Sequence, residues 1–343
     1  MLYLDHNATT PLLPEARRAM DEAHDAAWAN PASQHAWGRE AAAILERARA
    51  DVASLVGRGP ADVTFTSGAT EANSWLLGAM KGRIVATAVE HPSVRDWATD
   101  LVRVDARGVL DLDAFEDALG DDVAIASVMA ANNETGVIQP IAEVRALTRA
   151  RGILLHVDAT QVPGKIPFQI DADFITLSAH KFGGPKGVGV LVGDRPPAPM
   201  LRGGSQERGR RAGTVNVPGI AGMGAAARIA RSRAIDPRER DRLEAATRAL
   251  GGRIVGEGAP RLPNTSLVLF DVPGDLVTMA LDLAGIGAST GSACLSGAHE
   301  PSFVLAAMGL EGVPVRFSVG RDTDVSAAID GLPAILEKLR ASL

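Results

Sequence analysis

The sequence of 343 residues lacks several features that mark whole classes of protein. Its single cysteine, Cys294, rules out an internal disulfide and a Cys-x-x-Cys metal site. No apolar run reaches the roughly 18 residues of a membrane-spanning helix, and no cluster of Lys or Arg offsets the net charge of −6. We therefore expect no membrane span and no direct nucleic-acid partner. The first residues have neither the basic nor the apolar region of a secretory signal, so we expect a cytoplasmic protein.

Lysine is also scarce, which narrows any lysine-dependent chemistry to five residues. They are Lys81, Lys165, Lys181, Lys186 and Lys338. Lys181 is the best candidate, because the run SAHKFGGPKGVG puts it at the end of an apolar strand, before glycines that let a ligand approach the backbone. A partly desolvated amine is a usable nucleophile near neutral pH. Lys165 is expected in a turn, and the glycine run taken alone is more often a turn than a site.

From about residue 60, short β-branched runs alternate with helix-like stretches. The runs lack a regular polar and apolar alternation, which is typical of parallel strands covered on both faces. They lie at 62–66, 83–87, 123–129, 153–158, 173–178 and 188–192, with helices such as 140–151 between them. This pattern predicts an α/β domain with a mostly parallel sheet, whose ligands lie beyond the carboxyl ends of the strands.

The C-terminal third has a different order of elements. A helical pattern from about residue 220 to 250, interrupted near Pro237, precedes strand-like runs at 265–270 and 313–320, and a helix begins at Asp275 between them. We expect a large α/β domain over 12–235. The rest, 1–11 and 236–343, is expected to form a smaller α+β domain that carries Cys294.

Two sites at the strand ends suit groups of opposite charge. Asp158 follows an apolar run, where an unpaired carboxylate is costly. A pyridinium nitrogen would satisfy it and would be kept protonated as an electron sink, although a cap on the next turn is an equal alternative. After Ser67-Gly68, the N–H groups of Ala69 and Thr70 at a helix start form an anion site suited to phosphate. A plain helix cap is the commoner use of such a string.

Three further side chains have reactive chemistry. His91 precedes a proline at a helix start, where it either stacks on a ligand ring and shuttles protons or is structural. Arg316 alternates with apolar neighbours in VRFSVGR and either clamps a carboxylate or faces solvent. Cys294 lies among Gly, Ser and Ala with little to pack, which favours a reactive thiol over a buried structural one.

Together these strings resemble the cysteine desulfurases of the NifS/IscS type, within the fold-type I pyridoxal phosphate (PLP) enzymes of the class V aminotransferase family. The resemblance follows one order over nearly the whole chain. It is carried by YLDHNATTP, NPASQHAWGREA, FTSGATEAN, EHPSV, NNETGVIQPI, HVDATQVPGKIP, SAHKFGGPKGVG, RGGSQERGRRAGT, STGSACLSGAHEPS and VRFSVGR. It implies a PLP-dependent transferase fold with a large α/β domain and a smaller α+β domain.

The resemblance also implies how PLP is held. Lys181 would bind the cofactor covalently, Asp158 would meet the pyridine nitrogen, and His91 would stack on the ring. The other implied contacts are Ala69, Thr70, Ser178 and His180 at the phosphate, and Gln161 and Asn133 near the ring oxygen or the substrate. Thr214 would reach the phosphate of the neighbouring subunit's site, which implies a homodimer.

The activity implied by the resemblance is conversion of L-cysteine to L-alanine. Arg316 and Asn133 would hold the substrate carboxylate, Lys181 would move the Cα proton, and the Cys294 thiolate would take the sulfur as a persulfide, with His91 exchanging a proton at the thiol. The sulfur would pass to an iron–sulfur scaffold or a thiolation acceptor protein. No resident metal is expected, although Cys294 is a candidate ligand of an iron–sulfur cluster shared with a partner.

Two alternatives stay open at this point. One is selenocysteine lyase or another class V aminotransferase or lyase, in which loss of Cys294 would matter less. The other is a catalytically silent regulatory homologue, against which the retained Lys181, Asp158, His91 and Cys294 argue.

Overall fold

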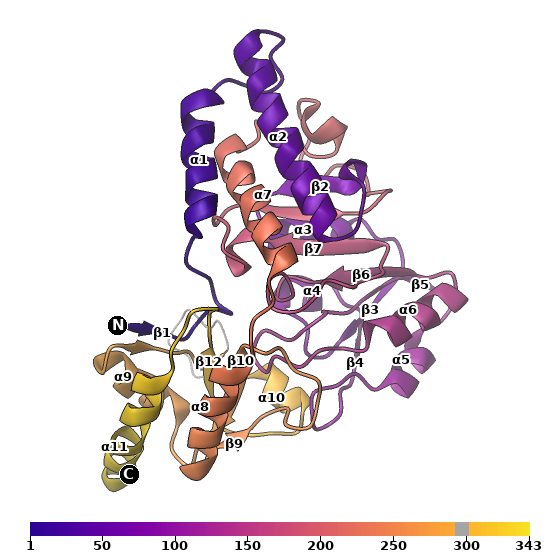
Figure 1. The fold of residues 1–343 in the computed structure, drawn as a ribbon. Helices are drawn as coiled ribbons and strands as arrows, with labels where there is room; N and C mark the ends of the chain where they lie inside the picture. Colours follow the sequence, from indigo (N-terminus) through magenta and orange to yellow (C-terminus); the bar gives the residue numbers. More distant parts are fainter. Residues whose placement is uncertain (292–301) are drawn as a thin grey trace.

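Seven strands form the main sheet of the computed structural model, which describes residues 1–291 and 302–343 (Figure 1). In spatial order they are β2 (Val63–Thr66), β8 (Gly189–Val192), β7 (Phe174–Ser178), β6 (Leu154–Asp158), β5 (Val123–Ser127), β3 (Arg83–Thr87) and β4 (Asp100–Val102). Strand β8 is antiparallel to both of its neighbours, whereas the others are parallel to one another. The carboxyl ends of these six strands therefore meet at one edge of the sheet.

Apolar side chains cover both faces of this sheet. Val190 and Val192 of β8 belong to the core on one face, and Leu191 between them belongs to the core on the other. The first face is covered by α1 (Pro14–Ala26), α2 (Ala36–Leu55), α5 (Leu112–Ala118), α6 (Ile141–Ala150) and α7 (Val217–Ser232). The second face is covered by α3 (Ala69–Gly78) and the short α4 (Pro92–Arg95). Burial on both faces explains why the strands lack a polar and apolar alternation.

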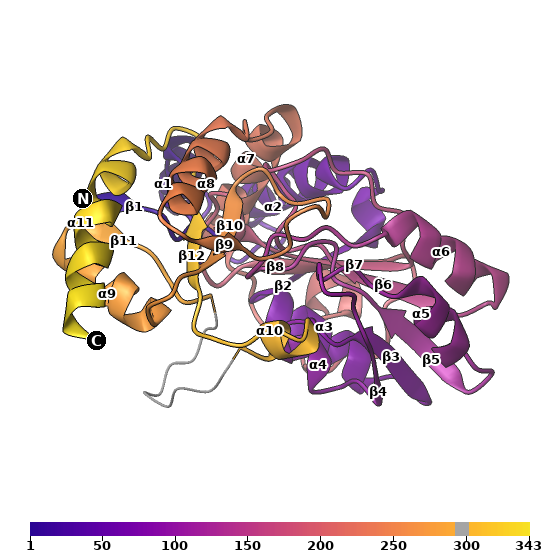
Figure 2. The ribbon, with the colours of Figure 1, turned by 90° about the horizontal axis from the view of Figure 1, so that it is seen from below.

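The C-terminal part has its own sheets and core. Strands β9 (Arg253–Ile254), β10 (Thr265–Leu269) and β12 (Val315–Ser318) form an antiparallel sheet. Four helices accompany them, namely α8 (Arg238–Ala249), α9 (Gly274–Leu283), α10 (Phe303–Ala307) and α11 (Ser326–Ser342). Strand β1 (Leu2–Tyr3) pairs in parallel with β11 (Ile286–Gly287), which places the N-terminus beside α9 and α11 (Figures 1 and 2). The first residues thus join the C-terminal part.

The predicted α/β class with a mostly parallel sheet is confirmed, and the element boundaries differ by a few residues. The run expected as a strand over 123–129 ends at Ser127, because the Met129 N–H donates to the Glu90 carboxylate at 2.7 Å. The run expected over 313–320 is a strand only over Val315–Ser318. Three short 3-10 helices, η1 (Pro60–Asp62), η2 (Ala179–Lys181) and η3 (Gln206–Gly209), complete the elements of the described residues. The domain boundaries at 11/12 and 235/236 stay a prediction.

Within 1–291 and 302–343, no helix is both long enough and apolar enough to cross a membrane.

Candidate active site

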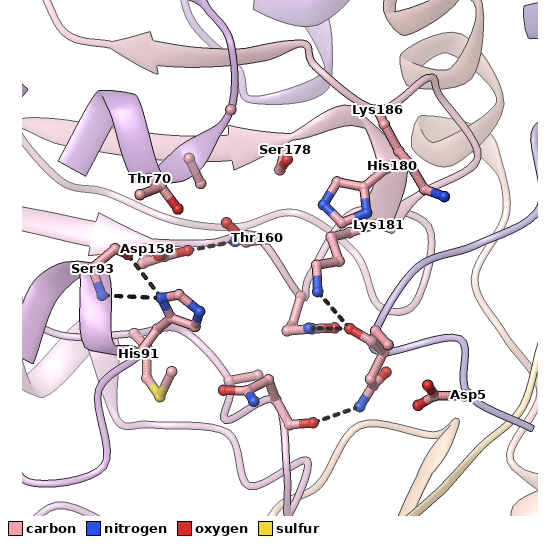
Figure 3. A pocket seen from close by; sticks show the side chains of 18 of the residues that line it. Asp5, Thr70, His91, Ser93, Asp158, Thr160, Ser178, His180, Lys181 and Lys186 are labelled. Atoms are coloured by element: carbon pink, nitrogen blue, oxygen red, sulfur yellow. Dashed lines mark hydrogen bonds between the residues drawn. The ribbon is translucent and has the colours of Figure 1, made fainter. Parts of the chain in front are cut away.

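A cavity of about 760 Å³ opens at the carboxyl edge of the main sheet (Figure 3). Among the described residues, every site residue expected from the sequence lines it, apart from Thr214. These residues are Ala69, Thr70, His91, Asn133, Asp158, Gln161, Ser178, His180, Lys181 and Arg316. Figure 3 shows the Lys181 side chain extending into the cavity, with Asp158 and His91 on one side and Asp5 on the other. Polar residues from separate strand ends thus face one space.

Lys181 is presented by a buried strand followed by a tight turn. All five residues of β7 are buried, and η2 follows directly and ends at Lys181. The Lys181 Nζ donates a hydrogen bond to the backbone carbonyl of Asn7 at 2.6 Å. Burial, with the nearby charge of Arg316, lowers the pKa of Lys181 to about 8, although Asp158 and Asp5 act in the opposite direction. Near neutral pH this amine is therefore far more often unprotonated than an ordinary lysine.

Asp158 is the last residue of β6, and it is buried. Its carboxylate accepts hydrogen bonds from Asn73 Nδ2 at 2.9 Å and from the Thr160 N–H at 3.0 Å. The second bond is the cap on the following turn, so this structural role of Asp158 is present. Both donors are neutral, which leaves the negative charge of the carboxylate available to a cationic group in the cavity.

The expected anion site lies where β2 meets α3. The Thr66 hydroxyl donates to the Gly68 carbonyl at 2.9 Å and holds the turn, and α3 begins at the next residue. The first N–H groups of a helix have no partner within the helix and form its positive end. A Cβ at Gly189 would lie 2.5 Å from Gly68 Cα, so glycine at this position lets β8 run against the turn. With Ser178 on the adjoining strand, this end of the cavity suits a phosphate.

The two histidines of the cavity are both neutral at pH 7. His91 precedes α4, and its Nδ1 accepts from the Ser93 N–H at 3.1 Å, so the ring proton is on Nε2. The surrounding protein desolvates the ring and lowers the pKa of His91. Burial and the charges of Lys181 and Lys186 lower the pKa of His180 to about 4. His91 therefore both caps a helix and presents an uncharged ring to the cavity.

Arg316 lies on β12 and is only 3% exposed, so the alternative in which it faces solvent is wrong. Its Nη2 donates to Asp5 at 2.6 Å, and its Nη1 donates to the backbone carbonyls of Asn133 at 3.0 Å and Gly291 at 3.1 Å. Its Nε is buried and has no hydrogen-bond partner among the described residues. Arg316 lines the cavity, where a guanidinium is suited to a carboxylate ligand.

Asn7 is the central residue of the site that sequence reasoning missed. Its carbonyl accepts from Lys181 and from Gln161 Nε2 at 3.0 Å, and its Oδ1 accepts from Lys165 Nζ at 2.9 Å. Its Nδ2 donates to Asn133 O at 3.1 Å. Asn7 belongs to the string YLDHNATTP, but nothing in its own spacing indicates that it meets residues more than a hundred positions away.

Lys165, Asp5 and Asn73 were also not predicted as site residues. Lys165 lies in a turn, as expected, and its side chain is buried there. Asn73 is on the second turn of α3 and faces Asp158 because the helix starts at the edge of the sheet. A lysine between apolar turn residues in HVDATQVPGKIP was the one available signal of burial.

Of the expected site residues within the described parts of the chain, Thr214 alone does not line this cavity. Thr214 is exposed and follows Arg211, which is tied to Glu71 of α3 at 2.9 Å. Cys294 lies outside the described residues. The nearest described neighbours on its two sides are Gly291, which lines the cavity, and Ser302, whose hydroxyl donates to the buried Glu134 at 2.7 Å.

The residues present fit PLP in three respects. They combine an available amine, a buried carboxylate bonded only to neutral donors, and a helix N-terminus with hydroxyls beside it. These groups would serve the aldehyde carbon, the ring nitrogen and the phosphate of the cofactor, respectively.

Comparisons with known proteins give one consistent answer. The family model for aminotransferase class V matches residues 2–328. A cysteine desulfurase from Rhodobacter capsulatus is 44% identical over 99% of this chain and 97% of its own length, and one from Gluconacetobacter diazotrophicus is 41% identical over 99% and 94%. Among solved structures, a NifS-like protein superimposes with a TM-score of 0.90 at 33% identity over the full length of both chains.

Proposed function

This chain belongs to the aminotransferase class V family, and from that premise we propose that it is a PLP-dependent cysteine desulfurase. The observation that carries the proposal is the position of Lys181. Its buried amine, with a pKa lowered to about 8, lies in a cavity that also holds the Asp158 carboxylate and the start of α3. The family uses PLP, and the cysteine desulfurases that resemble this chain cover almost all of it.

The expected site residues that line the cavity would contact three parts of the cofactor: the ring, the ring oxygen and the phosphate. When bound, PLP supplies an electron sink that stabilises negative charge at the substrate Cα. Asp158 would keep the ring nitrogen protonated, and His91 would lie against the ring. The phosphate would be held by Ala69, Thr70, Ser178 and His180, and the ring oxygen would face Gln161 and Asn133. The chemistry of these side chains supports this arrangement.

The chain's own groups would then carry L-cysteine through desulfuration. Arg316, with Asn133 beside it, would hold the substrate carboxylate. Lys181, which would hold the cofactor, would also move the Cα proton of the substrate as general base and acid. The Cys294 thiolate would attack the substrate sulfur, so that the Cβ–S bond breaks as the S–S bond of a persulfide forms. His91 would exchange the proton at the thiol, and alanine would leave.

We further propose the partners that this chemistry requires. Thr214 would reach the phosphate in the neighbouring subunit of a homodimer, which is consistent with its exposure away from the cavity of its own chain. The persulfide sulfur would pass to an iron–sulfur scaffold or a thiolation acceptor protein in the cytoplasm.

The proposal is tested by mixing the purified protein with L-cysteine and dithiothreitol, a thiol that reduces the persulfide and releases its outer sulfur as sulfide, and measuring alanine, sulfide and the visible spectrum of the cofactor. We expect alanine and sulfide in equal amounts from the wild type, a yellow but inactive Cys294→Ala variant, and an inactive Lys181→Ala variant. A yellow wild type that forms no alanine, or a fully active Cys294→Ala variant, would show that the protein is not a desulfurase of this kind.

A further inference from the structure

Lys165 is buried next to the cavity and has no acidic partner within 1–291 and 302–343. Its Nζ donates hydrogen bonds first to Gln161 Oε1 and second to Asn7 Oδ1, the latter at 2.9 Å. The charged groups that act on it are Lys181 and Arg316, and both are cations. Burial and these two charges lower the pKa of Lys165 well below the usual value of a lysine.

Such a residue works against the stability of the fold. A buried amine loses its hydration, and two neighbouring cations disfavour its charged form. An apolar side chain of similar length would fill the same space without this cost. Lys165 is therefore better explained by what its two hydrogen bonds hold in place than by its contribution to folding.

The first of these bonds fixes the orientation of the Gln161 amide. An amide has an oxygen end that accepts and a nitrogen end that donates, and the two ends have nearly the same shape. Lys165 supplies N–H donors, so the end that faces it is Oε1. Nε2 is then turned toward the site, where one N–H donates to the Asn7 carbonyl at 3.0 Å and the second remains for the cavity that Gln161 lines.

The second bond fixes Asn7 in the same way. Asn7 Oδ1 accepts from Lys165 and from Asn264 Nδ2 at 3.1 Å, which leaves Asn7 Nδ2 to donate to Thr265 at 2.9 Å and to Asn133 O. The backbone carbonyl of Asn7 accepts a hydrogen bond from Lys181 Nζ. One buried lysine thus holds Gln161 and the residue whose carbonyl accepts from the Lys181 amine.

We propose that Lys165 is a positioning residue of this site, which turns the N–H donor of Gln161 toward the ring oxygen of PLP and holds the Asn7 carbonyl against Lys181. The inference rests on the proposed function, because it assumes that PLP occupies the cavity. An N–H donor favours the more negative form of the group that it faces, so Gln161 in this orientation lowers the pKa at which the bound cofactor loses its proton.

The test is a pH titration of the visible spectrum of the holoenzyme without cysteine. In Lys165→Met the Gln161 amide loses one of the two bonds that orient it and keeps only its bond to the Asn7 carbonyl. Its N–H donor is then held less firmly toward the ring, and we expect the titration midpoint to rise by about one pH unit. Lys81→Met is the matched control, since it removes an exposed lysine far from the site, and its midpoint should equal that of the wild type.

A double substitution separates positioning from a general disturbance of the site. Gln161→Leu removes the proposed donor and should raise the midpoint by itself. If Lys165 acts through Gln161, adding Lys165→Met to Gln161→Leu should shift the midpoint no further, because the two substitutions remove one interaction. A wild-type midpoint in Lys165→Met, or shifts that add in the double variant, would overturn the proposal.

Lys165→Gln decides the question if Lys165→Met does not fold. It keeps an amide N–H donor in the same place, so a midpoint below that of Gln161→Leu supports the proposal, and one at or above it contradicts the proposal. The titration needs no substrate. A wild type that titrates but forms no alanine would therefore refute the proposed function while the variants still decide the role of Lys165.

Discussion

At the scale of single residues, the site is controlled by cations brought together in a buried space. Burial and the charge of Arg316 lower the pKa of both Lys181 and Lys165, and the charge of Lys181 lowers the pKa of Lys165 further. Asp5 accepts a hydrogen bond from Arg316 and partly neutralises its charge. Of the carboxylates that raise the pKa of Lys181, Asp158 has the largest effect. This balance leaves Lys181 as a free amine more often than its type allows elsewhere.

The first prediction concerns the pH dependence of Lys181 in the cofactor-free protein. With a pKa of about 8, the amine is free in about a tenth of molecules at pH 7, against fewer than about one in a thousand for an unperturbed lysine. Only the free amine reacts with an acylating reagent. The rate of Lys181 acetylation, followed by mass spectrometry, should therefore rise about tenfold per pH unit up to pH 8 and then level off.

Removing the charge of Arg316 tests the sign of its effect on the pKa of Lys181. Arg316→Met takes away a cation and should move the midpoint for Lys181 up, whereas Arg253→Met, at an exposed position on β9, should leave it unchanged. A rate that keeps rising through pH 10 in the wild type would mean that Lys181 is an ordinary lysine.

At the scale of elements, one buried ion pair ties the segment after β8 to the main sheet. Glu207 in η3 forms hydrogen bonds with Arg49 of α2 at 2.7 and 2.8 Å, and the Phe65 N–H of β2 donates to the same carboxylate at 2.8 Å. Glu207 and Arg208 both have positive φ angles, 48° and 58°, which are unfavourable for residues other than glycine. The ion pair offsets this strain and fixes the segment that leads to Thr214.

The second prediction is that this pair dominates the stability of the segment. Glu207→Gln leaves the Arg49 charge buried without its partner, and we expect the free energy of unfolding in urea to fall by about 3–5 kcal/mol. Glu46→Gln is the matched control. Glu46 also bonds to Arg49, at 3.0 Å, but its side chain is 50% exposed, so its loss should cost less than about 1 kcal/mol. Equal losses in the two variants would show that burial of the pair is not what matters.

At the scale of the whole molecule, the architecture was predictable because it depends on local patterns. Continuous apolar strands such as that ending at Asp158 indicate a sheet buried on both faces, and parallel strands bring their carboxyl ends to one edge. The residues that follow those strands were therefore predicted together and do line one cavity. Lys181, Asp158 and Thr70 could be predicted because each lies at or just after the end of an apolar strand that the sequence itself reveals.

The rest of the site arises from contacts between distant parts of the chain. Asn7 and Lys165 are separated by 158 residues, and their hydrogen bond exists only because the N-terminal segment crosses the carboxyl edge of the sheet. Asp5 and Arg316 are 311 residues apart. Neither pair has a pattern in the sequence, because each side chain gains its function from where packing places it.

The last prediction concerns a second copy of the chain. The resemblance places Thr214 at the phosphate of the partner's site, and in this chain Thr214 is exposed and lies outside the wall of its own cavity. A carboxylate at this position would repel the phosphate, so the Thr214→Asp variant should not retain the cofactor. The Lys181→Ala variant lacks the amine that the reaction needs. Each variant alone should form no alanine.

Mixed dimers of the two variants distinguish action between subunits from action within one. If Thr214 serves the partner, a mixed dimer contains one site with an intact Lys181 from one chain and an intact Thr214 from the other. Random assembly of equal amounts makes half of the dimers mixed, so refolding or co-expressing the variants should restore roughly a quarter of the wild-type sites. If Thr214 serves its own subunit, every site carries one defect, and the mixture stays as inactive as its parents. The yield of alanine from the mixture therefore tests both the dimer and the direction in which Thr214 reaches.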